Sequence, residues 1–231
     1  LPPAKIVKEY LQDSFILYKP KDIVAGDFYS LEHKNDHILF AAADCTGHGV
    51  PGAMVSVICN NGLNRSVREL GLTDPGKILD NTRDIVIKEF EKSEEEVQDG
   101  MDIALCALKG NELTYAGAHN PLWIIRKGAS EIEELKANKQ PIGKFRHSEA
   151  FDSQSVNLEK GDTFYIFTDG FVDQFGGEKG KKFKSSNFKK LLLSIQNKSM
   201  AEQKEFLDKT FEERKGHLEQ LDDVCVIGVR L

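Results

Sequence analysis

The chain has 231 residues, of which 40% are hydrophobic and 29% are charged, and its formal net charge is −6 at pH 7. The length fits one large domain or two small ones, and the composition is that of an ordinary soluble globular chain that can bury a sizeable core. The negative charge disfavours a nucleic-acid-binding protein, which needs a basic face. No apolar run approaches the roughly 20 residues of a membrane span, so we expect no membrane contact by this segment.

Apolar runs predict three strands near the beginning of the chain, at Ser14–Lys19, Asp27–Glu32 and His37–Ala43. The third run is almost continuously apolar, so we expect a central strand. A helix is predicted from Pro51, because proline suits the first turn of a helix. Met54, Val57 and Ile58 share one face of this helix.

The next helix is marked by Asp74 as its cap, by Pro75 in its first position and by apolar residues at helical spacing as far as Phe90. Residues 91–100 are acidic and carry no pattern, which predicts a solvated loop. Short strands separated by turns then predict an antiparallel meander. Its strands are Asp102–Leu108, Glu112–Ala116, Leu122–Arg126 and Glu131–Leu135.

The last third of the chain combines strands and helices. Its segments are a strand at Thr163–Thr168, a mobile basic loop at 176–184, helices at Asn187–Gln196 and 199–214, and a strand at Val224–Val229. The second helix opens on the capping-box pattern of Ser199 and Glu202. The order of elements lacks the alternation of a doubly wound sheet and shows no linker. It predicts one α+β domain over residues 1–231, with antiparallel sheets covered by helices.

Acidic residues stand at the ends of the apolar strands. If these strands lie in facing sheets, their ends converge on one edge and bring the carboxylates together. Converging carboxylates repel each other, so either their pKa values rise or cations neutralise them. Carboxylates without a His or Cys ligand set favour Mg²⁺, Mn²⁺ or Ca²⁺. The alternative is that each acid only forms a turn. The acids are Asp27, Asp44, Asp169, Asp222 and Asp223.

Other polar residues carry weaker signals. His48 lies in a Gly-His-Gly turn, where it is either a functional residue or a residue whose backbone the turn orients. His119 is interpreted as a turn residue, and Asp102 as the first residue of a strand or a contact to an outer ion. The lysines of residues 179–182 form a solvated loop or a basic lid that meets a phosphoprotein. The glycines around His48 lack the Gly-Lys-Ser/Thr pattern of a nucleotide-binding loop.

Six motifs occur in a fixed order: GDFY at 26–29, ADCTGHGVPGA at 43–53, GAHNP at 117–121, PIG at 141–143, FTDG at 167–170 and LDDV at 221–224. Together they closely resemble the SpoIIE-like branch (sporulation stage II protein E type) of the metal-dependent PPM, or protein phosphatase 2C, superfamily. The resemblance covers the chain from Ile6 to Leu231. It implies a central β-sandwich of two antiparallel sheets with helices on both outer faces. It also implies hydrolysis of phosphoserine or phosphothreonine on a partner protein in bacterial signalling.

The resemblance also implies a set of metal ligands. Asp44 matches the acid that bridges two ions of Mn²⁺ or Mg²⁺, and the backbone carbonyl of Cys45 matches the carbonyl that completes one shell. A water molecule that bridges the two ions is the implied nucleophile, so the Cys45 thiol is not needed. The catalytic role falls to Asp27, Asp44 and Asp169. The remaining implied metal ligands are Asp27, Asp169 and Asp222, with Asp223 as the alternative to Asp222.

Candidate contacts to the phosphate group are lysines. Eukaryotic relatives hold phosphate with an Arg near the amino terminus, and this chain has no matching Arg. Lys19, Lys21 and Lys181 are therefore the candidates. The Asp-Gly-His order of those relatives is also missing, so a general-acid role does not carry over to His48.

The resemblance implies partners as well. Bacterial members usually act on anti-sigma-factor antagonist domains and often follow a sensor domain, so we expect an output domain at the C-terminal end of a longer chain. The resemblance does not decide whether the chain forms a homodimer. A shift of the helix from Pro51 would shift Asp44, which makes this helix a candidate for regulation. The alternatives are a partner-docking domain of the same fold without catalysis, and a calcium-stabilised adhesion-like sandwich. The presence of all the matched acids favours the enzyme.

The cysteines and the first residues of the chain are used to predict the cellular compartment of the protein. The four cysteines are far apart and form no Cys-x-x-Cys pair, which disfavours a thiolate zinc site and predicts buried thiols in a reducing cytosol. No signal-peptide pattern is present, and Leu1 stands where an intact chain would have Met. We therefore expect a piece of a longer cytoplasmic protein, with tethering to a membrane sensor left open.

Overall fold

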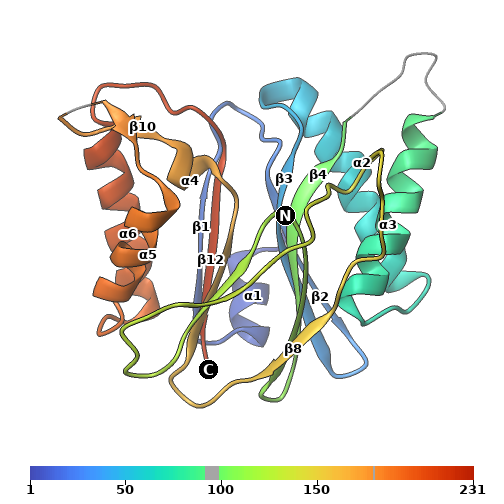
Figure 1. Ribbon diagram of the computed structural model, residues 1–231, viewed down its shortest axis with the longest axis horizontal. Helices are drawn as coiled ribbons and strands as arrows, with labels where there is room; N and C mark the ends of the chain where they lie inside the picture. The colour runs from blue at the N-terminus through green and yellow to red at the C-terminus, as the bar shows by residue number, and fades with distance from the viewer. Residues whose placement is uncertain (92–98, 179) are drawn as a thin grey trace.

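Two antiparallel sheets face each other in the computed structural model, which describes residues 1–91, 99–178 and 180–231 (Figure 1). The first sheet contains, in spatial order, β1 (Ser14–Lys19), β12 (Val224–Arg230), β9 (Thr163–Phe167), β6 (Leu122–Ile125) and β7 (Glu133–Leu135). The second contains β2 (Phe28–Lys34), β3 (His37–Cys45), β4 (Met101–Lys109), β5 (Glu112–Ala118) and β8 (Gln154–Asn157). A small ribbon pairs β10 (Phe175–Gly176) with β11 (Lys181–Lys182).

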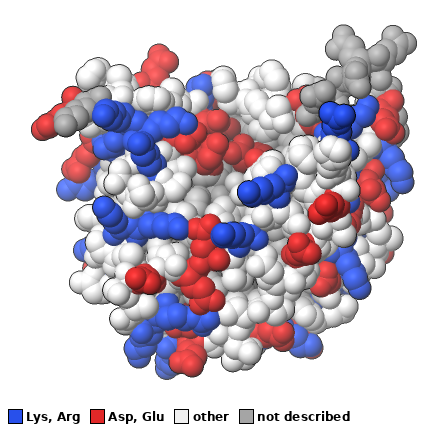
Figure 2. Space-filling view, viewed as in Figure 1, with Lys and Arg blue, Asp and Glu red and all other residues white. Residues whose placement is uncertain are grey.

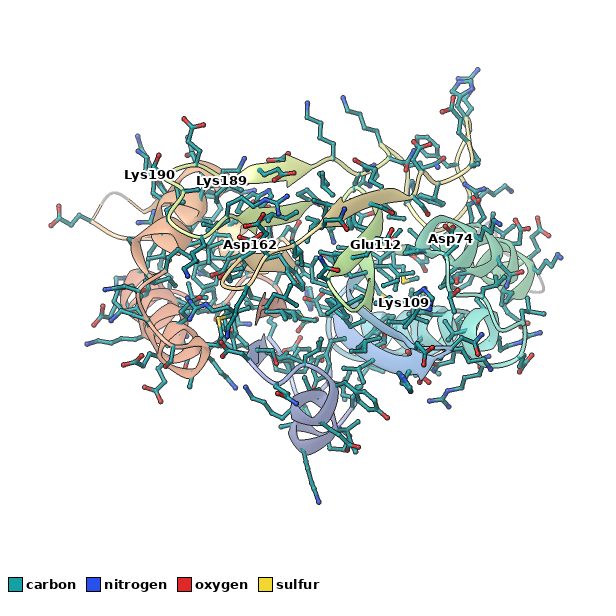
Figure 3. The ribbon with its side chains drawn as sticks, turned by 90° about the horizontal axis from the view of Figure 1, so that it is seen from below. Asp74, Lys109, Glu112, Asp162, Lys189 and Lys190 are labelled. Carbon is teal, nitrogen blue, oxygen red and sulfur yellow. The ribbon has the colours of Figure 1, made fainter. Side chains whose placement is uncertain are left out.

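Helices cover the outer face of each sheet. The pair α2 (Gly49–Arg68) and α3 (Pro75–Phe90) lies on the second sheet, and the pair α5 (Ser185–Ser194) and α6 (Met200–Lys215) lies on the first (Figure 1). Seen from below, Asp74 at the start of α3 lies on the opposite side of the sandwich from Lys189 and Lys190 of α5 (Figure 3). Two short helices complete the fold, α1 (Ala4–Tyr10) and α4 (Gly170–Asp173). The predicted α+β sandwich with helices on both outer faces is confirmed.

Three apolar layers hold the sheets and helices together. The middle layer lies between the sheets and includes Phe40 and Phe164, whose ring centroids are 6.0 Å apart. Leu39 and Ala41 of β3 point the other way and pack under α2 and α3. A third layer, around Phe171, lies between the first sheet and helices α5 and α6. Because side chains alternate along a strand, burial on both sides makes β3 apolar throughout, and its predicted central position is confirmed.

Several local predictions hold in the structure. The Asp74 side chain accepts a hydrogen bond from the backbone N–H of Lys77 at 2.9 Å and caps α3. Ser199 and Glu202 form a complete capping box at the start of α6. All four cysteines are buried and free. Among the described residues, no helix combines the length and apolar character needed to span a membrane.

The structure corrects the expected face of α2. Met54 and Val57 are 67% and 68% exposed, whereas Val55 packs in the core. The buried face also carries Gly52 and Gly62, so the helix approaches its neighbours through its small residues. A Cβ atom on Gly52 would lie 2.1 Å from a backbone oxygen, so the close approach decides which face turns inward.

Among the described residues, the elements that no sequence pattern predicted are α1, α4, β8, β10 and β11. The helix α1 buries only Val7, and the edge strand β8 alternates between partly buried and exposed residues, so neither carries a strong apolar signal. The expected mobile loop at 176–184 instead contains the ribbon strand β11, and Lys182 pairs with Asp173 at 2.7 Å. Residue 179, and residues 92–98 of the expected loop at 91–100, lie outside the described residues.

Candidate active site

The strand ends bring the acidic residues to one edge of the sandwich. In the second sheet, antiparallel pairing sets Phe28 opposite Ala43 and Asp44 opposite Asp102. In the first sheet, the end of β9 lies beside the beginning of β12. Acidic side chains gather at this edge near α4, with basic side chains toward β10 (Figure 2). The opposite end of β4 carries the hairpin turn between Lys109 and Glu112, which is seen from below (Figure 3).

The pKa values show that these acids act on one another. Burial raises the pKa of Asp44 to about 9, and the charges of Asp27, Asp169 and Asp222 add to the rise. Burial and then the charge of Asp173 raise the pKa of Asp169 to about 6, with a further contribution from Asp222. The structure therefore brings together Asp27, Asp44, Asp169 and Asp222 from four separate segments.

Asp27 links the two sheets. It is 3% exposed, and its carboxylate accepts a hydrogen bond from the Thr168 hydroxyl at 2.6 Å. Burial raises the pKa of Asp27 to about 8; the Thr168 hydrogen bond opposes this rise, and the charge of Asp223 adds to it. The backbone N–H of Cys225 donates to the Thr168 hydroxyl at 2.9 Å, which fixes that hydroxyl. Thr168 was not among the predicted site residues, although it stands within the FTDG motif.

Asp222 and Asp223 have different surroundings. Asp223 is 1% exposed. Its two carboxylate oxygens accept from the backbone N–H groups of Lys21 and Gly26, each at 2.7 Å. Asp223 thus anchors the loop that leads to Asp27. Asp222 is less buried, and one of its oxygens accepts from the backbone N–H of Asp223 at 2.8 Å.

Glycines let this loop pack against the turn after β3. A Cβ atom on Gly26 would lie 2.3 Å from the backbone oxygen of Gly47, and one on Gly52 would lie 2.1 Å from the same oxygen. Gly47 itself has a φ of +84°, a conformation that suits glycine. Larger residues at these positions would push apart the segments that carry Asp27 and Asp44.

A cleft of about 200 Å³ opens beside Asp44 and Asp169. Asp102 lines this cleft and accepts a hydrogen bond from Nδ1 of His119 at 2.8 Å. His119 has a φ of +56°, so a turn residue was the correct prediction, but its contact with Asp102 was missed. The remaining residues that line the cleft are Thr46, Gly100, Met101, Pro141 and Gly143.

The environment of the Cys45 thiol disfavours the reactive thiolate form. The side chain is buried, and its hydrogen bond with Cys59, together with burial, holds the pKa of the thiol well above its usual value. Because the thiolate is the reactive form of cysteine, this thiol is inert near neutral pH. A backbone role for Cys45 is compatible with this environment.

The three candidate lysines differ in their partners. The Lys19 ammonium pairs with Asp208 at 2.5 Å and with Glu212 at 2.8 Å, both on α6. Because two carboxylates already neutralise it, Lys19 is a weaker candidate for a phosphate contact than the other two lysines. Lys181 lies exposed in β11. Lys21 contacts the ring of His48 at 3.0 Å.

The chemistry of the donor set fits a hard cation. The neighbouring charges that raise the pKa values of Asp27 and Asp44 belong to acids, so a divalent cation would relieve their repulsion. In residues 1–91, 99–178 and 180–231, no three His, Cys, Asp or Glu side chains form a ready-made metal cage. Carboxylate oxygens are the ligands that Mg²⁺ and Ca²⁺ prefer, so these acids would serve as ligands of such a cation.

Comparisons with known proteins identify relatives of this chain. A family model described as "Stage II sporulation protein E (SpoIIE)" matches residues 34–231. The curated protein "Phosphoserine phosphatase RsbU" of Bacillus subtilis (strain 168) is 26% identical over 177 residues, which is 74% of this chain and 49% of RsbU. The chain thus spans about half the length of that relative.

Two solved structures share the fold. The "SiaA-PP2C domain of Pseudomonas aeruginosa" is 32% identical with a TM-score of 0.89, and the match covers 99% of this chain and 90% of that one. The PP2C phosphatase domain of SpoIIE from Bacillus subtilis, solved with a fragment of its regulatory domain, is 18% identical with a TM-score of 0.74. That match covers 94% of this chain and 62% of the other, and it shows the fold alone. The chain belongs to the SpoIIE family and is a phosphatase domain of the PP2C type.

Proposed function

We propose that this chain hydrolyses phosphoserine or phosphothreonine on a partner protein in a metal-dependent reaction. The observation that carries the proposal is that Asp44 and Asp169 line one cleft, that the charge of the buried Asp27 acts on Asp44, and that burial and neighbouring acids raise the pKa values of all three. The likeness to RsbU, whose name gives phosphoserine phosphatase activity, supports it.

We propose that the cofactors are two ions of Mn²⁺ or Mg²⁺. Asp44 would lie between them, and the backbone carbonyl of Cys45 together with Asp169 and Asp222 would supply further ligands. Asp27 would stand near the first ion. Asp222 is the better candidate than Asp223, because backbone N–H groups occupy both oxygens of Asp223. Bound there, the two cations would lower the pKa of a water molecule and neutralise charge on the phosphoryl oxygens.

The residues of the chain orient this chemistry. In the overall reaction, the oxygen of a water molecule bonds to phosphorus, the bond between phosphorus and the serine or threonine oxygen breaks, and a proton from water ends on the leaving hydroxyl. Thr168 holds the Asp27 carboxylate, and Asp223 holds the loop before it. The raised pKa of Asp169, about 6, keeps this acid able to exchange a proton near neutral pH until a cation ionises it. Lys21 and Lys181 are the stronger candidates for contact with the phosphoprotein.

The partners are proposed by likeness. We propose an anti-sigma-factor antagonist-like domain as the substrate, a sensor domain upstream in the same chain and a cytoplasmic location. The greater length of RsbU is compatible with an additional domain in the whole protein. The molar mass of the chain in solution would show whether it forms a homodimer.

Hydrolysis of p-nitrophenyl phosphate tests the proposal. We expect activity with Mn²⁺ or Mg²⁺ that EDTA abolishes, and the same metal requirement with a phosphorylated antagonist domain as substrate. Activity that survives EDTA would contradict metal dependence. A chain that binds the phosphorylated domain but shows no turnover under any metal condition would favour the docking alternative.

A further inference from the structure

Three polar side chains connect the loop after β1 to the turn after β3. Nε2 of His48 lies 3.0 Å from Nζ of Lys21, and Nδ1 of His48 lies 3.2 Å from Oδ2 of Asp22. An ammonium group has only donors, so Nε2 of His48 accepts from Lys21. The ring proton then lies on Nδ1 and is donated to Asp22. The hydrogen bonds to Asp22 and from Lys21 together fix the tautomer and the orientation of the His48 ring.

The backbone on each side is built around this contact. The backbone N–H of Lys21 donates to the buried Asp223 at 2.7 Å, which holds the loop at the acidic edge. Gly49 follows His48 with a φ of +63°, and a Cβ atom there would lie 3.1 Å from Oδ2 of Asp22. Glycine therefore leaves room for the Asp22 carboxylate beside the histidine.

The contacts among Asp22, His48 and Lys21 contribute little to the stability of the fold. The side chains of His48 and Asp22 are 50% and 49% exposed. Ion pairs and hydrogen bonds between such exposed groups add little to the stability of a fold. The contact does, however, hold the Lys21 ammonium against the turn that follows Asp44 and Cys45.

The partner of Lys21 differs from those of other lysines near this edge. Lys19 is paired with two carboxylates, and Lys182 is paired with the Asp173 carboxylate. Lys21 instead donates to an imidazole nitrogen, which accepts a hydrogen bond without neutralising the positive charge. Within residues 1–91, 99–178 and 180–231 no other acceptor contacts this ammonium group, so two of its three protons stay available. This is the chemistry needed to hold a phosphate dianion.

We propose that His48 is a positioning residue that aims the Lys21 ammonium at the phosphate group of the substrate, and that Asp22 fixes the ring of His48. This inference rests on the proposed phosphatase function, in which Lys21 contacts the phosphoprotein. It assigns a role to the histidine of the Gly-His-Gly turn, which the set of metal ligands does not use.

The experiment compares Lys21→Met, His48→Ala, His48→Gln and the double variant Lys21→Met/His48→Ala in the full chain with Mn²⁺. A charge-assisted hydrogen bond to phosphate contributes about a tenfold change in binding. We expect Lys21→Met to raise both KM for p-nitrophenyl phosphate and the inhibition constant of inorganic phosphate by about tenfold. His48→Ala should raise both by several-fold, with kcat nearly unchanged. His48→Gln retains an oxygen acceptor for Lys21 and should recover part of the loss.

Non-additivity is the readout that a merely structural role would not produce. If His48 acts through Lys21, the double variant should be no worse than Lys21→Met alone. His37→Ala is the matched control, because His37 is a histidine at the opposite end of β3 with its own contact to the Asn35 carbonyl. This control should leave KM unchanged. Calorimetric titration with Mn²⁺ should give the same affinity for His48→Ala and the unsubstituted chain, which separates a phosphate effect from a displaced metal site.

Two outcomes would overturn the inference: an active chain in which His48→Ala changes neither KM nor phosphate inhibition, or fully additive effects of Lys21→Met and His48→Ala. If the proposed phosphatase function is wrong, the unsubstituted chain will itself be inactive with every metal, which distinguishes that failure from a failure of the inference on His48. In that case, calorimetry with inorganic phosphate still decides the inference. Weaker phosphate binding by His48→Ala supports it, and equal binding or the absence of phosphate binding by the unsubstituted chain overturns it.

Discussion

Thr168 donates a hydrogen bond from its hydroxyl to the Asp27 carboxylate at 2.6 Å, and so joins the end of β9 in one sheet to the loop that enters β2 in the other. The same hydroxyl accepts from the backbone N–H of Cys225 at 2.9 Å. One side chain therefore sets the spacing between the two sheets at the edge where the acids meet. The relationship makes Thr168 a supporting residue for the proposed metal site.

Replacement of Thr168 by Val should weaken Mn²⁺ binding by about 10- to 100-fold, because groups that orient a metal ligand commonly have effects of this size. Valine keeps the shape of the side chain and removes the hydroxyl. Thr168→Ser keeps the hydroxyl and is the matched control. Isothermal titration calorimetry with Mn²⁺ measures the effect, and equal affinities for the Val and Ser variants would exclude an orienting role for the hydroxyl.

Replacement of Asp44 by Asn should lower kcat for p-nitrophenyl phosphate by at least about 100-fold and weaken Mn²⁺ binding, because it removes the proposed bridging carboxylate. Asp36→Asn is the control, since Asp36 lies in the turn at the opposite end of β3 and its left-handed backbone suits asparagine. Near-normal turnover by Asp44→Asn would refute the metal assignment.

Asp44→Asn should stabilise the metal-free protein near neutral pH, although it lowers turnover and metal binding. Burial and the neighbouring Asp27 raise the pKa of Asp44 to about 9 in the folded state, whereas an unfolded aspartate ionises near pH ~4. Between these values the unfolded state binds fewer protons than the folded state, so the free energy of unfolding falls as pH rises. Below this range both states are protonated and the difference disappears.

Urea denaturation in EDTA at pH 5 and pH 8 tests this prediction. The unsubstituted protein should lose stability between the two pH values, and Asp44→Asn should lose less and be the more stable protein at pH 8. An equal or steeper loss for the Asn variant would show that Asp44 is ionised in the metal-free fold.

Replacement of Cys45 by Ala should leave kcat within about twofold, because the high pKa of the buried thiol rules out nucleophilic use near neutral pH. The Ala variant keeps the backbone carbonyl that is the proposed ligand. Steady-state kinetics with Mn²⁺ measures the result, and circular dichroism checks that the variant is folded. A folded but inactive Cys45→Ala protein would point to a role for the thiol.

Two glycines of α2 should respond differently to alanine. A Cβ atom on Gly52 would lie 2.1 Å from the backbone oxygen of Gly47, and relief of such a clash typically costs about 1–3 kcal/mol or more. On Gly62 the nearest atom would be a Thr82 methyl carbon at 3.4 Å, and alanine favours a helix by about 1 kcal/mol over glycine.

Thermal unfolding and p-nitrophenyl phosphate hydrolysis should therefore show an unstable and weakly active Gly52→Ala variant beside a stable and active Gly62→Ala variant. Equal behaviour of the two variants would contradict the close packing of the Gly47 turn against the start of α2.

Much of the fold follows from local patterns in the chain. The nearly continuous apolar run of His37–Ala43 predicts a central strand, and the structure confirms it as β3, which is buried on both faces. The caps at Asp74 and Ser199 are equally local, because each satisfies backbone donors within its own first turn. The edge strand β8 was missed, since half of its residues face solvent and no apolar alternation marks it.

The candidate site divides in the same way. The sequence by itself determined which residue types stand at the strand ends, and its ordered motifs indicated the family before any geometry was known. It could not distinguish Lys19 from Lys21, or Asp222 from Asp223, because members of each pair are close in sequence and share a charge. Their partners come from segments up to about 200 positions away, as with Lys19 and Asp208 or Lys21 and Asp223.

Only the tertiary structure decided which acid anchors a loop, which lysine keeps its charge available and which face of α2 turns inward. The physical reason is that burial, repulsion between carboxylates and hydrogen-bond pairing depend on groups that folding brings together. Asp27 shows this most directly: burial and the charge of Asp223 raise its pKa to about 8, and its hydrogen-bond partner Thr168 lies 141 positions further along the chain. The sequence determined which acidic and basic side chains the protein contains. The packing of the two sheets determined where those side chains meet.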